Sequence, residues 1–241
     1  MIHALLISIS GTPPAGWEEG LLFEIWRNLI QADRYMMLVN GLGLTLQIAV
    51  FSVVIGTALG FILALMKISR IRLFDAIATV YISVIRGIPL LVQLLIMNFV
   101  ILPPTTPRLL VCIITFGINS SAYVAEIFRA GILSVDHGQT EAGRSVGLSS
   151  TQTMGLIVFP QAIKNALPPL VSEFIILFKD TSIVGFIGVQ DITMMGNVIR
   201  SRTFTAFVPL ITVALVYLAV VIILTWLMGK LERRLRISDT R

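Results

Sequence analysis

The chain has 241 residues, of which 56% are hydrophobic and only 13% are charged, and its mean hydropathy is +0.92. A soluble domain carries about a quarter charged residues, so this composition argues against a soluble domain and indicates a membrane protein. The net charge of +5 is carried in short groups beside apolar runs, as at membrane flanks, and we predict no nucleic-acid partner. The single cysteine, Cys112, excludes an internal disulfide, and with His3 and His137 far apart we predict no metal site.

The first 40 residues are expected to lie at the membrane interface. Residues 1–10 are apolar but lack the basic start of a secretory signal, so an interfacial segment and a signal-like start both stay open. Residues 17–37 mix Trp17, Trp26 and Tyr35 with charged and apolar positions. This pattern is typical of an amphipathic helix that lies in the plane of the interface.

Five later segments are apolar enough to span a bilayer, which needs about 20 residues. They cover residues 41–66, 76–102, 108–132, 164–187 and 207–228. The first contains no charge, and its Gly56 and Gly60 permit close helix approach. The fourth is the least regular, because Pro160, Pro168 and Pro169 interrupt the pattern, and we expect it to be kinked.

Flanking charge sets the expected topology. Lys67, Arg70 and Arg72 follow the first span, and the tail at 231–241 is basic, so both places are predicted to be cytoplasmic and the N-terminus to lie outside. Arg200 and Arg202, on the predicted outer side, count against this assignment. We predict an all-α membrane protein with five transmembrane helices: an interfacial segment at 1–40, one transmembrane domain at 41–230 and the tail.

A polar insert at about residues 134–160 separates the third and fourth spans. Because the first span ends in the cytoplasm and the next two spans leave it and return, the insert is predicted to lie in the cytoplasm. Its small residues would let a helix approach a partner closely, and Gly147 can end that helix in the left-handed conformation. An ordinary loop with a good helix end is the alternative. The positions that define the insert are Glu141, Ala142, Gly143, Gly147, Ile157 and Pro160.

The insert resembles the coupling loop of ABC-importer permeases, and further motifs resemble the subfamily for histidine, glutamine, glutamate and arginine uptake. The resemblance covers about residues 40–230 and departs from the family at Gly143, where Ala is usual, and at Phe159, where Leu is common. The further motifs are Arg86-Gly87-Ile88-Pro89-Leu90-Leu91-Val92-Gln93, Pro160-Gln161-Ala162 and Lys179-Asp180-Thr181-Ser182.

The resemblance implies a type I importer permease with a cytoplasmic coupling helix in a bacterial inner membrane. It implies a second permease subunit, identical or similar, an ATPase dimer docked on the coupling loops, and an extracytoplasmic protein that delivers a polar amino acid. The chain contains no G-x-x-x-x-G-K-[ST] phosphate-binding loop. We therefore expect it not to be an enzyme by itself, with ATP and Mg on the partner ATPase subunits.

Charges inside the spans are candidates for function, because intramembrane charge is costly. Glu126 and Arg129 are spaced to form a structural ion pair. Glu173, Lys179 and Asp180, in the fourth span, can line the pathway and meet the charged ends of an amino acid, and a packing role is equally open.

Other polar positions have two interpretations. Asn98 and Asn119 can bind substrate, or they can bond neighbouring helices. Arg86, Gly87 and Pro89 mark a helix break from which the arginine can snorkel to the cytoplasmic surface.

Two other classes of function are weighed against the importer. A secondary transporter driven by an ion gradient would be expected to show paired half-repeats, and no internal symmetry is visible. An intramembrane Ser-His hydrolase would need a base near a residue such as Ser121, whereas His137 lies in the polar insert. Which amino acid is carried, and whether the second subunit is another copy, cannot be read from the chain.

Overall fold

A computed structural model describes residues 20–69 and 71–237, with side chains up to residue 230. The expectations for residues 1–19 and for the side chains of the basic tail, Arg236 included, lie outside the described residues. Throughout the described ranges the chain is helical, without a strand, in agreement with the all-α prediction. It forms two compact units, which we describe separately: unit 1 is Met1–Gln47 with Phe178–Ile223, and unit 2 is Ile48–Leu177 with Leu224–Arg241.

Three helical stretches in the described part of the chain are long and apolar enough to cross a membrane. They are Leu21–Ile68, Arg108–Leu133 and Phe207–Lys230. A bent pair, Arg72–Gly87 with Leu90–Ile101, passes the same test if its two parts, which meet at 102°, form one span. The structure thus supports three or four of the five spans expected from the sequence. The segment around the expected fourth span is not among them, because proline and charged residues interrupt its apolar pattern.

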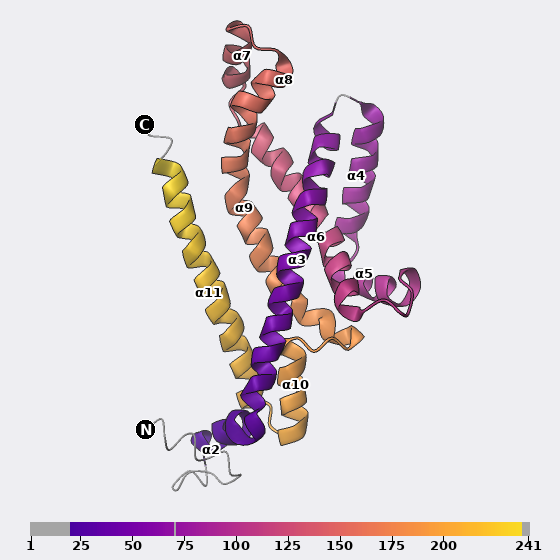
Figure 1. Cartoon of the computed structure of the whole chain (residues 1–241), viewed down its shortest axis with the longest axis vertical. Coiled ribbons are helices and arrows are strands. Elements are labelled where there is room, and N and C mark those ends of the chain that lie inside the picture. Colours follow the sequence, from indigo (N-terminus) through magenta and orange to yellow (C-terminus); the bar gives the residue numbers. More distant parts are fainter. Residues whose placement is uncertain (1–19, 70, 238–241) are drawn as a thin grey trace. The chain divides into compact units, whose positions relative to one another are not determined.

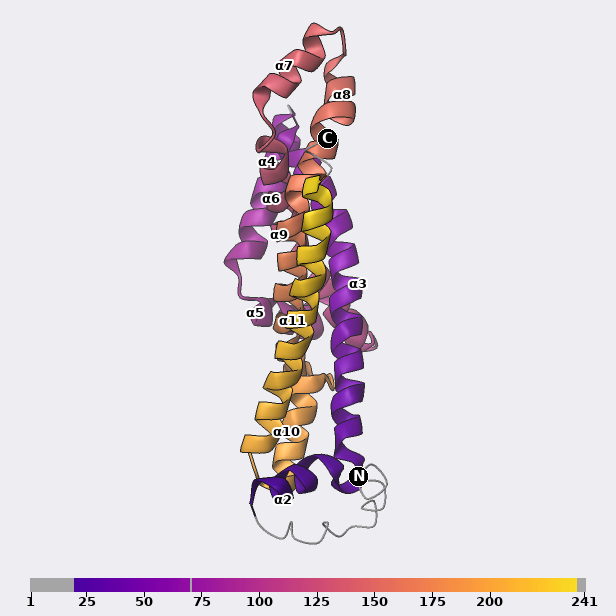
Figure 2. The same ribbon diagram turned by 90° about the vertical axis from the view of Figure 1, so that its left-hand side faces the viewer.

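The segment that the sequence predicted to lie at the interface is broken rather than a single helix. It consists of α2 (Leu21–Ile25), a π turn η2 (Trp26–Ile30) and a 3-10 turn η3 (Gln31–Asp33). Ala32 and Asp33 have positive φ angles of 55° and 49°, and this turn redirects the chain into α3 (Arg34–Ile68). Figure 2 shows α2 beside the start of α3 and the end of α10 (Ile192–Thr203), where Thr203 contacts Asn28 of η2. The first long helix therefore begins at Arg34, before the boundary at residue 41 that the sequence predicted.

The core of unit 1 joins α3 to α10 and α11 (Phe207–Ile237). Leu38, Ile192, Met195, Ile199 and Val213 form its buried cluster. Between Asp180 and α10 the chain forms a 3-10 helix, η6 (Thr181–Ile187).

The start of α10 is fixed by a cap and a close helix contact. Asp191 is fully buried and accepts hydrogen bonds from the backbone N–H groups of Thr193 (3.0 Å) and Met194 (2.9 Å). Burial raises the pKa of the Asp191 carboxyl, and these hydrogen bonds partly oppose the shift. A Cβ on Gly41 would lie 2.9 Å from the Asp191–Ile192 backbone, so only glycine allows this approach.

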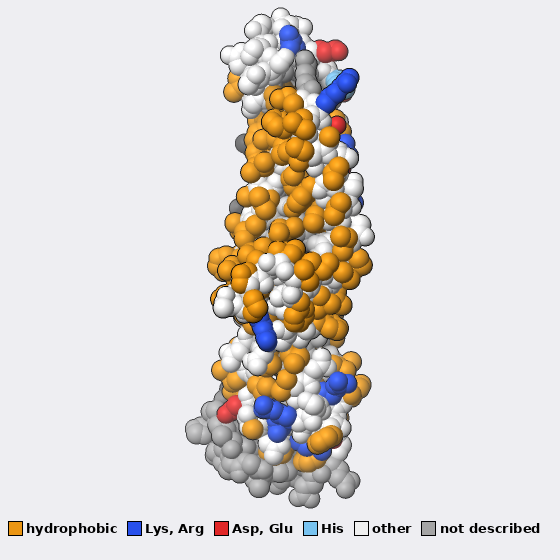
Figure 3. Space-filling view, turned by 90° about the vertical axis from the view of Figure 1, so that its right-hand side faces the viewer, with side chains coloured by type: hydrophobic (Ala, Val, Ile, Leu, Met, Phe, Trp, Pro, Cys, Tyr) orange, Lys and Arg blue, Asp and Glu red, His pale blue; other side chains and the backbone are white. Residues whose placement is uncertain are grey.

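In unit 2, α3, α4 (Arg72–Gly87) and α6 (Arg108–Leu133) lie side by side (Figure 1). A Cβ on Gly56 would lie 2.8 Å from Ser120 Cβ, and one on Gly60 would lie 2.7 Å from Val124 Cβ. The predicted close approach at this glycine pair is thus present between α3 and α6. On α4, an exposed apolar stripe is spaced to face lipid, and Figure 3 shows hydrophobic side chains on this side. The stripe consists of Leu73, Ile77, Val80 and Val84.

Helix α9 (Phe159–Asp180) begins earlier than the predicted fourth span and runs on through its prolines. Pro160, Pro168 and Pro169 all lie inside it, whereas the sequence predicted a kinked span that starts near residue 164. A π turn, η5 (Met154–Val158), directly precedes Pro160. Local π turns and neighbouring helices are known means by which membrane helices accommodate the hydrogen bonds that proline removes.

Candidate functional site

A two-helix hairpin at one end of unit 2 carries the predicted coupling residues. It consists of α7 (His137–Ser145), α8 (Ser150–Thr153) and the π turn η5, and it projects beyond the ends of α6 and α9 (Figure 1). Asp136 caps α7 by accepting from the backbone N–H of Gly138 at 2.6 Å. Ser149 and Gln152 form a capping box that starts α8, with bonds of 2.9 and 3.3 Å. Both helix starts are therefore set by residues within the hairpin.

Gly147 ends α7 in the left-handed conformation, as the sequence led us to expect. Its φ is 89°, and its N–H donates to the Arg144 carbonyl at 3.1 Å, while the Leu148 N–H donates to the Gly143 carbonyl at 3.1 Å. This pair of bonds is the Schellman arrangement, which satisfies the last carbonyls of a helix. The turn between α7 and α8 consequently depends on a backbone angle that a side chain at this position would oppose.

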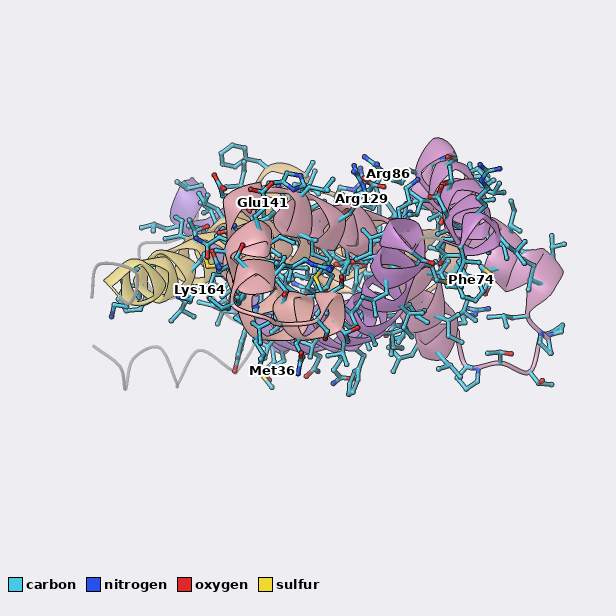
Figure 4. The ribbon with its side chains drawn as sticks, turned by 90° about the horizontal axis from the view of Figure 1, so that it is seen from above. Met36, Phe74, Arg86, Arg129, Glu141 and Lys164 are labelled. Carbon is cyan, nitrogen blue, oxygen red and sulfur yellow. The ribbon has the colours of Figure 1, made fainter. Side chains whose placement is uncertain are left out.

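Gly143 has a different reason to be glycine. It is buried, and a Cβ there would lie 2.8 Å from both Thr153 Cγ2 and Ile157 Cδ1. The departure from the family's usual alanine is therefore matched by close packing of α7 on α8 and η5. In contrast, Glu141 and Ala142 are exposed on the same helix, as is Pro160 beyond it, and Figure 4 shows Glu141 from above.

The hairpin also exposes apolar side chains. Val146 is 78% exposed and Leu156 is 68% exposed. Such side chains beside Glu141 and Ala142 give the hairpin a surface that a protein partner can cover.

Unit 2 also contains a cavity of about 660 Å³ between α4, α6 and α9. Arg86 comes from α4, Tyr123 and the Glu126–Arg129 turn come from α6, and α9 contributes Glu173. Figure 4 labels Arg86 and Arg129, which both line this cavity. The other lining residues are Ile127, Ala130, Gly131, Ser134, Asn165, Pro169, Ser172 and Ile176.

The charges that α6 brings to this cavity are paired. Arg129 Nε donates to Glu126 Oε2 at 2.8 Å, and a second guanidinium nitrogen lies 2.7 Å from the same oxygen. Their side chains are 35% and 23% exposed, so the pair lies at the cavity wall rather than in the packed core. This arrangement matches the spacing from which a structural ion pair was predicted.

Glu173 joins α9 to α6 across the bundle. It is 7% exposed, and its Oε1 accepts a hydrogen bond from the buried Ser120 hydroxyl at 2.9 Å. Of the three charged candidates in the predicted fourth span, Glu173 is the one that lines this cavity. Lys179 and Asp180 fall in the last turn of α9, which belongs to unit 1.

A glutamine side chain forms hydrogen bonds across the helix break in the second apolar segment. Helix α4 ends at Gly87, Ile88 and Pro89 are extended, and α5 (Leu90–Ile96) then begins, followed by the π turn η4 (Met97–Ile101). Gln93 Nε2 donates to the Ile85 and Ile88 carbonyls at 2.7 and 2.8 Å. Two backbone carbonyls at the break thereby have a hydrogen-bond partner.

The two asparagine candidates lie elsewhere. Asn119 is buried and donates to Gln93 Oε1 at 3.3 Å, so it bonds a neighbouring helix in this structure. Asn98 is half-buried in η4. Neither residue lines the cavity.

Two cavity residues had little signal in the sequence. Arg86 was noticed there only as part of the helix break, although an arginine within an apolar run is itself a marker of function. Tyr123 had no signal, because its position in the cavity depends on how α6 faces α4. Across the described ranges, no group of three or more His, Cys, Asp or Glu side chains is placed to hold a metal ion.

Comparison with known proteins places this geometry in a family. Residues 56–237 match the family described as the binding-protein-dependent transport system inner membrane component. The arginine transport system permease protein ArtQ of Bacillus subtilis (strain 168) is 39% identical over 210 residues, covering 84% of this chain and 94% of ArtQ. The glutamine transport system permease protein GlnP of Escherichia coli (strain K12) is 35% identical over 206 residues, covering 83% of this chain and 94% of GlnP.

Solved structures agree. An amino acid ABC transporter crystallised with histidines matches with a TM-score of 0.80 and 41% identity, covering 84% of this chain and 96% of that one. The MetNI methionine ABC transporter in an inward-facing conformation matches with a TM-score of 0.67 over 83% of this chain and 97% of that one, and at 19% identity it supports the fold alone. On the family match and the identity to these permeases, the chain belongs to the binding-protein-dependent transport system inner membrane components.

Proposed function

We propose that this chain is the permease subunit of an ATP-driven importer of a polar amino acid. The observation that carries the proposal is the unit 2 cavity, whose wall holds both arginine and glutamate side chains within a bundle of apolar helices. A free amino acid carries both signs of charge, and intramembrane charges mark solute pathways. The identity to arginine and glutamine transport permeases supports the same class of substrate.

Glu173 is the proposed contact for the substrate's ammonium group. Its carboxylate is held by Ser120 at 2.9 Å and lines the cavity, so it is positioned rather than mobile. Asn98, Asn119, Lys179 and Asp180 remain candidates for other stages of the pathway. For Asn119 the bond to Gln93 favours a structural role in this conformation.

The α7–α8 hairpin is the proposed docking element for a cytoplasmic ATPase dimer, which would hold ATP and Mg. Glu141 and Ala142 are exposed and available to the partner, whereas Gly143 and Ile157 pack inside the hairpin and fix its shape. Gly147 sets the turn, and Pro160 begins the connection to α9. The chain itself would then perform no hydrolysis.

The topology proposed for the bacterial inner membrane keeps five spans. The bent α4–α5 pair would count as one span, and α9 would be the fifth, lined by protein rather than lipid because it carries prolines and charge. The N-terminus would lie outside and the C-terminus inside, with an interfacial segment at 1–40, a transmembrane domain at 41–230 and a tail at 231–241. Labelling of a cysteine placed at Arg236 from the outside of intact cells would contradict this orientation.

The working unit is proposed to contain a second permease subunit, identical or similar, and an extracytoplasmic binding protein. The alternative function is a secondary transporter driven by an ion gradient. Reconstituted vesicles containing the permease and its ATPase separate the two: we expect uptake of an amino acid from the binding protein to require ATP at the hairpin side and to persist without an ion gradient. Uptake that follows an ion gradient without ATP would overturn the proposal.

A further inference from the structure

We infer that Arg86 forms a carboxylate-binding subsite in the unit 2 cavity and receives the α-carboxylate of the transported amino acid. The inference rests on the proposed function and adds the group that recognises one end of the substrate. It also assigns a chemical class to the ligand: a solute that carries a free carboxylate, and not merely a polar side chain.

The first reason is that Arg86 lines the cavity without forming a salt bridge to either glutamate of the cavity wall. The salt bridges among the described residues include none to Arg86, whereas the other lining arginine, Arg129, is neutralised by Glu126. An arginine side chain remains charged at any physiological pH. Arg86 is exposed at the cavity wall, so its guanidinium group is available to an anionic group that enters the cavity.

The second reason is the orientation of the guanidinium group. Its central carbon lies 5.1 Å from the centroid of the Tyr123 ring, within the range of a cation–π contact. Contact with an aromatic ring holds the planar group while it retains N–H donors for other partners. Arginine can offer a carboxylate two parallel N–H donors, a geometry that lysine cannot provide.

The third reason is that the backbone beside Arg86 is fixed. Gln93 Nε2 bonds the carbonyls of Ile85 and Ile88, one residue before and two residues after the arginine. Gln93 is itself held by Asn119 of α6. A subsite is most effective when its supporting residues keep it in place before the ligand arrives.

The fourth reason is the position of Arg86 and Tyr123 along their helices. Arg86 follows the first residue of α4, Arg72, by about 21 Å along the helix axis, and Tyr123 precedes the end of α6 by about 15 Å. Tyr123 also lines the cavity, so this contact holds the guanidinium group at the cavity wall. Glu173 on α9 supplies the opposite charge in the same cavity, so the wall carries a group for each end of an amino-acid zwitterion.

The test is equilibrium dialysis of the purified permease–ATPase complex without its binding protein, which would otherwise impose its own selectivity. The probes are L-arginine and L-glutamine, each compared with its α-carboxamide, which keeps the side chain and the ammonium group but lacks the carboxylate charge. The variants are Arg86→Gln and Arg86→Lys. Arg72→Gln, on an exposed arginine of the same helix, is the matched control.

We expect the wild-type complex and Arg72→Gln to bind the better amino acid more tightly than its carboxamide. A charge-assisted hydrogen bond corresponds to roughly 10–100-fold in affinity. Arg86→Gln should therefore bind the amino acid roughly 10–100-fold more weakly than the wild type, whereas its affinity for the carboxamide should change by no more than about twofold. Arg86→Lys should bind the amino acid more tightly than Arg86→Gln but less tightly than the wild type, because lysine keeps the positive charge and lacks the paired N–H donors.

Several results would overturn the inference. They are an unchanged preference for the carboxylate in Arg86→Gln, equal loss of both ligands, failure of the variant complex to assemble, or no binding of either probe by the wild type. In each case ATP-dependent uptake by the wild-type transporter would still support the proposed function. Absence of that uptake would instead remove the proposed function itself.

Discussion

The α7–α8 hairpin and the cavity lie in the same unit but are stabilised in different ways. In the hairpin, the defining bonds join residues a few positions apart, such as Leu148 to Gly143 and Ser149 to Gln152. In the cavity, Ser120 bonds Glu173 from another helix, and Arg86 lies against Tyr123. The hairpin therefore owes its shape to its own backbone, whereas the cavity exists only when three helices are packed together.

This difference teaches which substitutions separate function from folding. A change in the hairpin should leave the helix bundle intact and alter only the coupling of transport to ATP hydrolysis. A change in the cavity removes a polar contact between helices, so its effect on transport and its effect on packing must be separated by paired variants.

The largest effect is expected at Glu173. Glu173→Ala removes the charge and leaves Ser120 without its buried acceptor, so uptake should fall by roughly 10–100-fold, as for other charge-assisted contacts. Glu173→Gln retains an oxygen for Ser120 and should preserve the amount of folded subunit while still lowering uptake. Initial uptake rates and detergent-solubilised yields would measure the two effects. Wild-type kinetics in both variants would remove Glu173 from the pathway.

Gly147 tests the hairpin without touching the cavity. Gly147→Ala places a side chain at φ 89°, which costs about 1–2 kcal/mol, although nothing lies within 4 Å of the new Cβ. Gly155→Ala is the matched control, because Gly155 is equally open and has no positive φ. We expect Gly147→Ala, and more strongly a bulky residue such as Gly147→Val, to lower the uptake per ATP hydrolysed while the subunit stays inserted. Unchanged coupling in Gly147→Val would contradict the docking role.

Gly143 tests packing inside the same hairpin. Gly143→Ala brings a methyl group within 2.8 Å of Thr153 Cγ2 and Ile157 Cδ1, and overpacking of this kind costs about 1–3 kcal/mol. Thr153→Ser removes the Cγ2 methyl, so the double variant should recover part of the loss in thermal unfolding of the complex. Strictly additive losses would show that the hairpin relaxes without this contact.

The smallest effect is expected at the Glu126–Arg129 pair. If water fills the cavity, this partly exposed pair should contribute about 0.2–0.5 kcal/mol in a double-mutant cycle of Glu126→Gln and Arg129→Gln. A coupling energy several times larger would indicate a dry cavity. The measurement thus reports on the environment in which Arg86 and Glu173 are proposed to act.

The sequence was sufficient where local chemistry decides the structure. Gly147 at a helix end and the Gly56–Gly60 pair were both identified correctly, because each depends on residue type and spacing. The composition likewise indicated an all-helical membrane protein.

The sequence was insufficient where packing between helices overrides the local backbone preference of a residue. The prolines of α9 predicted a kinked span that starts near residue 164, but the helix already begins at Phe159 and includes Pro160. The positive φ angles at Ala32 and Asp33, which place the start of α3 at Arg34, involve residues that seldom adopt them. Pairs such as Ser120 with Glu173 could not be predicted, because periodicity does not say which faces of two helices meet.

The double bond of Gln93 to the Ile85 and Ile88 carbonyls has a consequence for how the permease changes conformation. A hinge needs backbone groups that can exchange partners as the angle changes, and here those groups are already occupied by a side chain anchored to Asn119. These bonds brace the 102° corner between α4 and α5. In alternating access, we therefore expect α4, α5 and Arg86 to move together, so that the position of Arg86 changes with these helices and not by a change of its own side chain.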